Sequence, residues 1–201
     1  MKKIVLAWVV CVLGLVVLFA WLGNGWMPRT STHDDTGTGK ALLAAEFTLQ
    51  DAGGTTVTGA TYRGRYLLVY FGFTHCPDIC PTTLLLMGNA LKQLGDKAAR
   101  IQPLFITVDP ERDTPKVVGD YVAHFGKDFV GLTGSPAQIK AAADNFKVFY
   151  SAVADEKNGG AGTVDHSGFI YLMGPDGQYL SHFAASVSEQ ELVGGLRHAL
   201  R

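Results

Sequence analysis

Several features are scarce in this 201-residue sequence, and each scarcity excludes a class of protein. Only three cysteines are present, too few for a small fold held together by disulfide bonds. Charged residues make up 17% of the chain and the net charge is −1, so no basic excess would attract a nucleic acid. Apolar residues make up 47%, which excludes long disorder. One globular domain with an apolar attachment remains.

The attachment is the uncharged run from Ile4 to Leu22, which follows two lysines. As a helix with ~1.5 Å rise per residue it would span roughly 28 Å, close to the hydrocarbon thickness of a bilayer. A cleavable signal peptide is the alternative, but its apolar region is usually ~7–15 residues long and ends in small residues. This run ends in LFAWL instead. We therefore predict that residues 1–3 are a cytoplasmic stub and that residues 4–22 are an uncleaved transmembrane anchor.

The lysines before the anchor also set the expected orientation. Positive charges stay on the cytoplasmic side, which places the rest of the chain outside. We expect a single-pass protein of a bacterial inner membrane, with its C-terminal domain in the oxidising periplasm. Residues 23–40 are rich in Gly, Ser, Thr and Asp and are predicted to form a flexible tether. Residues 41–201 would then form the folded domain.

Hydrophobic periodicity and turn residues predict the elements of this domain. Its last helix is predicted from the capping box Ser188–Glu191. We expect a hairpin of 46–50 and 55–58, strands at 66–71, 101–108, 148–153, 168–173 and 179–183, and helices at 81–94, 115–125, 138–146 and 188–200. This order, with a Cys-containing junction between a buried strand and a helix, indicates an α/β fold: a thioredoxin-like sandwich with an N-terminal β-hairpin.

The junction reads FGFTHCPDICP, from Phe71 to Pro81. Cysteines at positions i and i+4 would share one side of a helix, with Cα atoms ~6 Å apart. That separation suits either a disulfide or two thiolates on one metal ion. With Pro77 starting the helix, its N-terminus would lower the pKa of both Cys76 and Cys80. A purely structural disulfide is the alternative, but so short a loop would add little stability.

Two soft thiolates select Cu(I), zinc or thiol–disulfide chemistry. A zinc finger is excluded because no second pair of closely spaced cysteines and no H-x-x-x-H is present. A third ligand would separate the remaining cases, and the candidate is His166 in TVDHSG, expected in a loop before the strand at 168–173. Spacing alone makes it a weak candidate, since a lone histidine is more often a core or surface residue. His75 adjoins Cys76 but is expected to point elsewhere.

Three segments together resemble the Sco/SenC family of copper-binding thioredoxin-fold proteins: FGFTHCPDICPTTL, VDPERDTP and VDHSGFIYLMGPDG. The similarity runs in order from about residue 45 to 200. It implies that Cys76, Cys80 and His166 bind copper, as Cu(I) and as Cu(II). It also implies a role in assembling the binuclear copper centre of cytochrome c oxidase. Asp78 and Asp109 match the motifs too, and we take them as residues that support the ligands.

The leading hypothesis is therefore a membrane-anchored copper metallochaperone rather than an enzyme. Its implied partners are the copper-receiving subunit of the oxidase and an upstream copper donor or thiol reductant. The alternative is a thiol–disulfide oxidoreductase that reduces the oxidase's copper-ligand cysteines, with Cys76 attacking and Cys80 resolving. A peroxidase on the same fold is the weakest hypothesis, because no arginine flanks Cys76.

Overall fold

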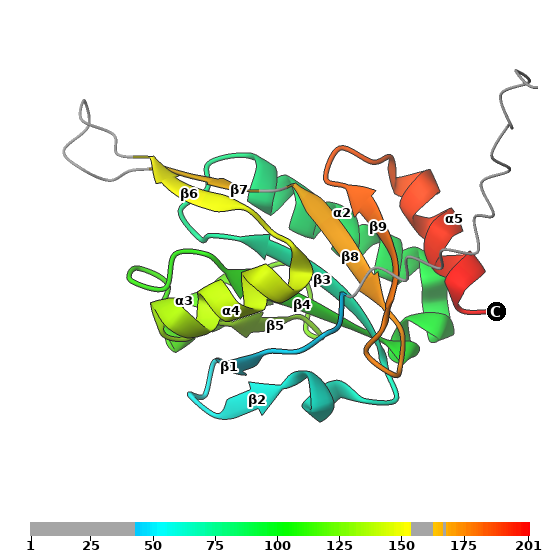
Figure 1. The fold of residues 1–201 in the computed structure, drawn as a ribbon. Coiled ribbons are helices and arrows are strands. Elements are labelled where there is room, and N and C mark those ends of the chain that lie inside the picture. Colours follow the sequence, from blue (N-terminus) through cyan, green and yellow to red (C-terminus); the bar gives the residue numbers. More distant parts are fainter. Residues whose placement is uncertain (1–42, 154–162, 167) are drawn as a thin grey trace, which may run out of the picture. The chain divides into compact units, whose positions relative to one another are not determined.

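The computed structural model describes residues 43–153, 163–166 and 168–201. Its strands are β1 (Thr48–Gln50), β2 (Thr56–Thr58), β3 (Tyr66–Gly72), β4 (Ile101–Thr107), β5 (Val130–Leu132), β6 (Tyr150–Val153), β7 (Thr163–His166), β8 (Phe169–Met173) and β9 (Tyr179–Ala184). Its α-helices are α2 (Ile79–Leu94), α3 (Pro115–Ala123), α4 (Pro136–Phe146) and α5 (Glu189–Ala199), and two 3-10 helices are η1 (Gly59–Tyr62) and η2 (Gly95–Arg100). Figure 1 shows how they are arranged.

A five-stranded sheet forms the centre of the domain, in the order β5-β4-β3-β8-β9. Strands β3, β4 and β5 are parallel, whereas β8 runs antiparallel to β3 and β9 antiparallel to β8. The hairpins β1–β2 and β6–β7 are separate two-stranded sheets. Because the parallel strands end at the same edge, the segments that follow β3 and β4 lie beside each other, and both lead toward helices.

The helices cover both faces of this sheet. Tyr70 and Phe71 are consecutive in β3 and so point to opposite faces. The hydroxyl of Tyr70 lies 3.9 Å from the sulfur of Cys80 in α2, whereas the ring of Phe71 packs against Phe146 of α4, with centroids 5.3 Å apart. Helix α5 packs against α2. Helices α2 and α5 therefore cover one face and α4 covers the other (Figure 1).

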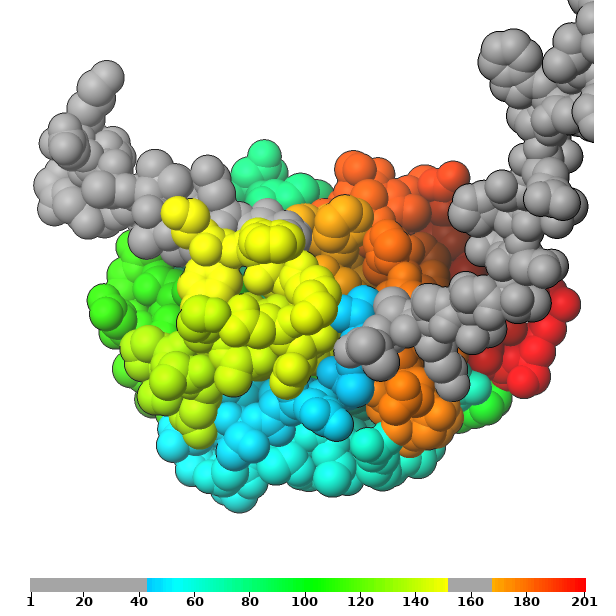
Figure 2. Space-filling view, viewed as in Figure 1, coloured from blue at the N-terminus to red at the C-terminus, as the bar shows by residue number. Residues whose placement is uncertain are grey.

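The core forms on both faces of β3 and β4. Six of the seven residues of β3 and all seven of β4 are buried. This is the burial expected of central parallel strands that helices cover on both sides. In the space-filling view, α4 lies on the face of the domain that is turned toward the viewer (Figure 2). The strands that lead to the Cys-containing segment are thus rigidly held.

The predicted α/β sandwich is confirmed, and so are the N-terminal hairpin, the three longest strands and the capping box of α5. Two short strands escaped prediction. Strand β5 has only three residues, one of them glycine, too few for a pattern. Strand β7 was expected to be a loop, but its backbone pairs with β6. Helix α2 begins at Ile79, earlier than Pro81, because a proline in the first turn removes no helical hydrogen bond.

The predicted anchor at 4–22 and tether at 23–40 lie outside the described residues. Within the described part of the chain, no helix is both long enough and apolar enough to cross a membrane.

Candidate metal centre

The two cysteines of the junction lie on different kinds of structure. Cys80 lies in the first turn of α2, whereas Cys76 lies before the helix, in the segment that follows β3. The prediction that both belong to one helix, opened by Pro77, is therefore wrong. The N–H of Cys76 instead donates to the carbonyl of Phe73 at 3.3 Å, which turns the chain back toward the helix.

A hydrogen bond nevertheless brings the two cysteines together. The backbone N–H of Cys80 donates to the sulfur of Cys76 at 3.4 Å. This N–H belongs to the first turn of α2, where backbone donors have no partner inside the helix. Neither side chain forms a disulfide, and Cys76 is half-buried whereas Cys80 is fully buried. Cys76 is thus the more accessible of the two thiols, as an attacking cysteine has to be.

Burial dominates the electrostatics of Cys80. It raises the pKa of the Cys80 thiol from 9.0 to about 12. The sequence had predicted a lowered pKa for this thiol from its place at a helix N-terminus. That prediction is wrong because removing a thiolate from water costs more than the helix dipole returns. The hydroxyl of Tyr70, 3.9 Å from the Cys80 sulfur, is itself buried, and burial likewise raises the pKa of Tyr70.

Gly72, the last residue of β3, makes room for the buried sulfur. A Cβ atom at this position would lie 2.7 Å from Sγ of Cys80 and 2.9 Å from Cε2 of Phe105. Real Cβ atoms do not approach other atoms so closely. The absence of a side chain at Gly72 therefore lets α2 pack its first turn against the end of β3.

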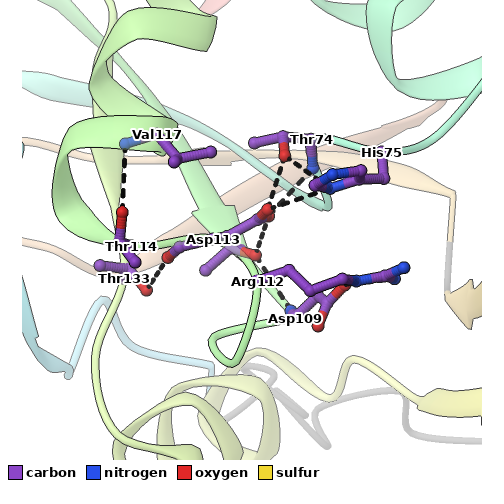
Figure 3. Close-up of polar contacts among 9 residues, drawn as sticks. Thr74, His75, Asp109, Arg112, Asp113, Thr114, Val117 and Thr133 are labelled. Atoms are coloured by element: carbon purple, nitrogen blue, oxygen red, sulfur yellow. Dashed lines mark hydrogen bonds and ion pairs between the residues drawn. The ribbon is translucent and has the colours of Figure 1, made fainter. Parts of the chain in front are cut away.

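A buried carboxylate that sequence reasoning did not select lies beside this segment. Asp113, in the segment after β4, is fully buried. It accepts hydrogen bonds from the N–H of Thr74 at 2.9 Å, from the Thr74 hydroxyl at 2.5 Å and from the Thr107 hydroxyl at 2.6 Å. Figure 3 shows the Thr74 and His75 side chains converging on it. Asp113 stands in the motif VDPERDTP together with Asp109, so the motif points to this segment but does not distinguish its two aspartates.

The two aspartates that the sequence selected make other contacts. Asp109 pairs with the guanidinium of Arg112, within its own loop. Asp78 occupies the N-cap position of α2, and its carboxylate accepts a 3.4 Å hydrogen bond from the hydroxyl of Thr82. Both therefore stabilise local turns, and their support of the ligands stays a prediction.

The imidazole ring of His75 turns its Nδ1 atom toward the buried carboxylate of Asp113. That atom lies 3.1 Å from the hydroxyl of Thr74 and 3.7 Å from Oδ1 of Asp113. The side chain is 56% exposed. His75 therefore belongs with Thr74 and Asp113.

His166, the predicted third ligand, lies in strand β7, where its backbone pairs with Tyr150 of β6. Its expected place in a loop is thus wrong, because this strand pairing continues to the residue itself. The side chain of His166 lies outside what the structure describes. Among the described side chains, no group of three or more His, Cys, Asp or Glu could hold a metal ion. The predicted three-residue ligand set therefore stays a prediction.

Comparison with known proteins identifies relatives along the described domain. The SCO1/SenC family model matches residues 35–201. A SCO2-like protein of Rickettsia prowazekii is 42% identical over 154 residues, covering 77% of this chain and 75% of the relative. The human mitochondrial SCO1 homologue is 36% identical over 165 residues, covering 81% of this chain and 54% of its own.

Solved structures agree with these relatives. Copper-bound ScoI of Bradyrhizobium japonicum superposes with a TM-score of 0.70 and 35% identity, covering 78% of this chain and 99% of its own. Copper-bound yeast Sco1 gives 0.71 and 37%, covering 78% and 87%. BsSco, described with a disulfide switch, gives 0.61 and 27%, covering 79% and 94%. The predicted thioredoxin-like fold is confirmed, and the chain belongs to the SCO1/SenC family.

Proposed function

We propose that this protein is a membrane-anchored copper metallochaperone that helps to assemble the binuclear copper centre of cytochrome c oxidase. Copper is its cargo, held by the sulfurs of Cys76 and Cys80 and by the imidazole of His166. Copper-bound ScoI and Sco1 among the similar structures support the metal. BsSco, described as a member of the Sco family of cytochrome c oxidase assembly proteins, supports the destination.

The observation that carries this proposal is the contact between the two cysteines. A 3.4 Å hydrogen bond from the N–H of Cys80 holds the Cys76 sulfur over the first turn of α2. Two adjacent soft sulfurs suit Cu(I), and an added imidazole extends the site to Cu(II). Because ligand sulfurs must be deprotonated, a bound copper ion replaces the proton that burial otherwise keeps on Cys80.

Unequal burial fits a site that both keeps and releases its cargo. Cys80 is fully buried and Cys76 half-buried, so copper would be reached from the Cys76 side. Three protein ligands leave a position through which a ligand of the acceptor can enter. The oxidase's copper-receiving subunit would bind the ion there before the first ligands leave it. An upstream donor would load the site through the same opening.

A copper titration of the full-length reduced chain, kept in detergent, tests the proposal. We expect one-to-one binding of Cu(I), and a sulfur-to-copper charge-transfer band with Cu(II). His166→Ala should weaken both, whereas His198→Ala, at an exposed position in the last turn of α5, should weaken neither. Absence of tight binding by the unsubstituted chain would overturn the copper proposal. Equal binding by the unsubstituted chain and His166→Ala would remove His166 from the ligand set.

The same unequal burial favours a second candidate function, a thiol–disulfide oxidoreductase. The Cys76 thiolate would attack a disulfide of the partner and form a mixed disulfide, releasing one partner thiolate. Cys80, after losing its proton, would then attack the Cys76 sulfur, form the Cys76–Cys80 disulfide and release the second thiolate. The raised pKa of Cys80 slows that second step.

His166→Ala separates the two functions in cells that depend on the oxidase. If copper delivery is the function, oxidase activity falls in this variant while the dithiol still reduces a model disulfide. If disulfide reduction is the function, oxidase activity survives the loss of the imidazole. Cys76→Ser should abolish oxidase assembly under either function and serves as the reference for complete loss.

A further inference from the structure

We infer that Asp113 is a positioning residue for the metal centre: its buried carboxylate holds the Cys76 segment in place before copper binds. The inference deepens the proposed function and depends on it for the identity of the cargo. It concerns a residue that makes no contact with the cargo and acts only through the chain that carries Cys76.

Both carboxylate oxygens of Asp113 accept hydrogen bonds from the segment that leads to Cys76. Thr74 donates twice, from its N–H to Oδ2 at 2.9 Å and from its hydroxyl to Oδ1 at 2.5 Å. These two bonds fix both the backbone and the side chain of a residue that lies two positions before Cys76. Hydrogen bonds to a charged acceptor are also about twice as strong as neutral ones. The two bonds therefore fix the direction in which the backbone runs from Thr74 toward Cys76.

The other contacts of Asp113 attach it to the sheet. The hydroxyl of Thr107, at the end of β4, donates to Oδ2 at 2.6 Å. The hydroxyl of Thr133, directly after β5, donates to the backbone carbonyl of Asp113 at 2.7 Å. Asp113 thus joins the ends of three neighbouring parallel strands at the edge where α2 begins. The segment that leads to Cys76 is therefore tied to the ends of these strands, and Figure 3 shows Asp113 between Thr74 and Thr133.

Burying a carboxylate costs free energy of folding, so its presence here is best explained by the position that it gives to the Cys76 segment. A carboxylate that is 0% exposed must be compensated by its hydrogen bonds, and an apolar residue would often stabilise the fold equally well. Residues behind metal ligands commonly fix the orientation of those ligands in this way. Here the fixed group would be the turn from Phe73 to Cys76, closed by the 3.3 Å bond between these residues.

A matched control is available at the opposite end of β4. Gln102 is also buried, accepts a 2.5 Å hydrogen bond from Arg65 and donates at 2.7 Å to the carbonyl of Asp128. It lies roughly 17 Å along the strand from Thr107, at about 3.3 Å per residue. Gln102→Ala therefore breaks a buried polar network in the same core without touching the Cys76 segment.

The test compares Asp113→Ala, Thr74→Val and Gln102→Ala in the full-length reduced chain. We measure Cu(I) affinity by chelator competition, the Cu(II) charge-transfer band, the melting temperature and the equilibrium of the Cys76–Cys80 disulfide with glutathione. Asp113→Ala should weaken Cu(I) binding ~10-fold or more, the effect known for residues behind metal ligands. Thr74→Val keeps the hydrogen bond from the backbone N–H of residue 74. It should therefore weaken Cu(I) binding less than Asp113→Ala does, and it should shift the Cu(II) charge-transfer band.

The Gln102→Ala control distinguishes a specific loss of copper affinity from a general loss of stability. Gln102→Ala should lower the melting temperature as Asp113→Ala does, yet leave copper affinity, spectrum and disulfide equilibrium unchanged. Unchanged copper affinity in Asp113→Ala, or an equal loss in Gln102→Ala, would overturn the inference. If Asp113→Ala does not fold, Thr74→Val gives the answer alone. If the unsubstituted chain binds no copper, the proposed function fails, and the disulfide equilibrium still tests the positioning role.

Discussion

The backbone N–H of Cys80 donates to the sulfur of Cys76, so a hydrogen bond rather than a helical turn joins the two cysteines. The donor belongs to the backbone and survives any substitution of the two side chains. Replacing the Cys80 side chain therefore leaves the contact in place, whereas a residue at position 76 keeps it only if its side chain offers an acceptor. The two positions differ in solvent exposure: the side chain of Cys76 is half-buried and that of Cys80 is fully buried.

We predict that serine at these two positions has unequal effects on stability. Cys76→Ser should change the free energy of unfolding by less than about 0.5 kcal/mol, because the half-buried hydroxyl still accepts the N–H of Cys80. Cys80→Ser places a hydroxyl in a fully buried position and should cost about 1–3 kcal/mol. Urea unfolding of the metal-free, reduced variants measures both values. Equal losses would contradict the assignment of burial.

Gly72 provides a second test, this time of packing. Gly72→Ala should destabilise the fold by about 1–3 kcal/mol and displace the Cys80 sulfur, because the added Cβ would lie 2.7 Å from it. Copper affinity should fall with it. Gly194→Ala in α5 is the control: its Cβ meets nothing within 4 Å, and alanine should stabilise that helix by about 0.5–1 kcal/mol. Thermal unfolding and chelator competition report both effects.

The raised pKa of Cys80 predicts a loss of stability at alkaline pH. The folded protein keeps this proton up to about pH 12, whereas the unfolded chain loses it near 9.0. The stabilisation is therefore complete below pH 9 and is lost as the pH rises toward 12, at up to about 1.4 kcal/mol per pH unit.

Comparison with Cys80→Ala isolates this contribution. Tyr70, which is buried, and Tyr121, which is partly buried, have raised pKa values and lower alkaline stability in both proteins. The free energy of unfolding of the reduced, metal-free protein, measured at pH 8, 9.5 and 10.5, should fall more steeply than that of Cys80→Ala. Parallel curves for the two proteins would show that Cys80 does not hold its proton in the folded state.

The N-terminal run predicts behaviour that cell fractionation can measure. The full-length chain should sediment with bacterial inner membranes and resist alkaline carbonate, because residues 4–22 supply a continuous apolar span. A variant lacking residues 4–22 should lose this retention. A reporter that is active only in the periplasm should be active at the C-terminus of the full-length chain. Retention of the shortened variant, or an inactive reporter, would contradict the anchor or its orientation.

Much of the fold was predictable because its elements carry strong local signals. The apolar run of β3 and the capping box of α5 are visible in the sequence, and both elements form where expected. Strand β7 carries no such signal, since its pairing with β6 depends on a partner elsewhere in the chain. Short strands made by pairing rather than by periodicity were missed for this reason.

The candidate site divides in the same way. Cys76 and Cys80 are recognisable from their spacing, but the pKa of Cys80 depends on its burial, which no local pattern reveals. Asp109 and Asp113 stand in one motif, and only the contact between Thr74 and Asp113, across 39 positions of sequence, distinguishes them. Long-range packing therefore decides which acidic residue faces the Cys76 segment.

The separation of β6–β7 from the central sheet has a consequence for how the proposed copper cargo would be released. Along the described residues, β6 and β7 pair with each other, while the cysteines follow β3 of the five-stranded sheet. A shift of His166 relative to Cys76 and Cys80 thus breaks no strand pairing in that sheet. In the proposed three-ligand site, the two-stranded ribbon would therefore move when the site opens, while the strands that lead to the two sulfurs would keep their pairing.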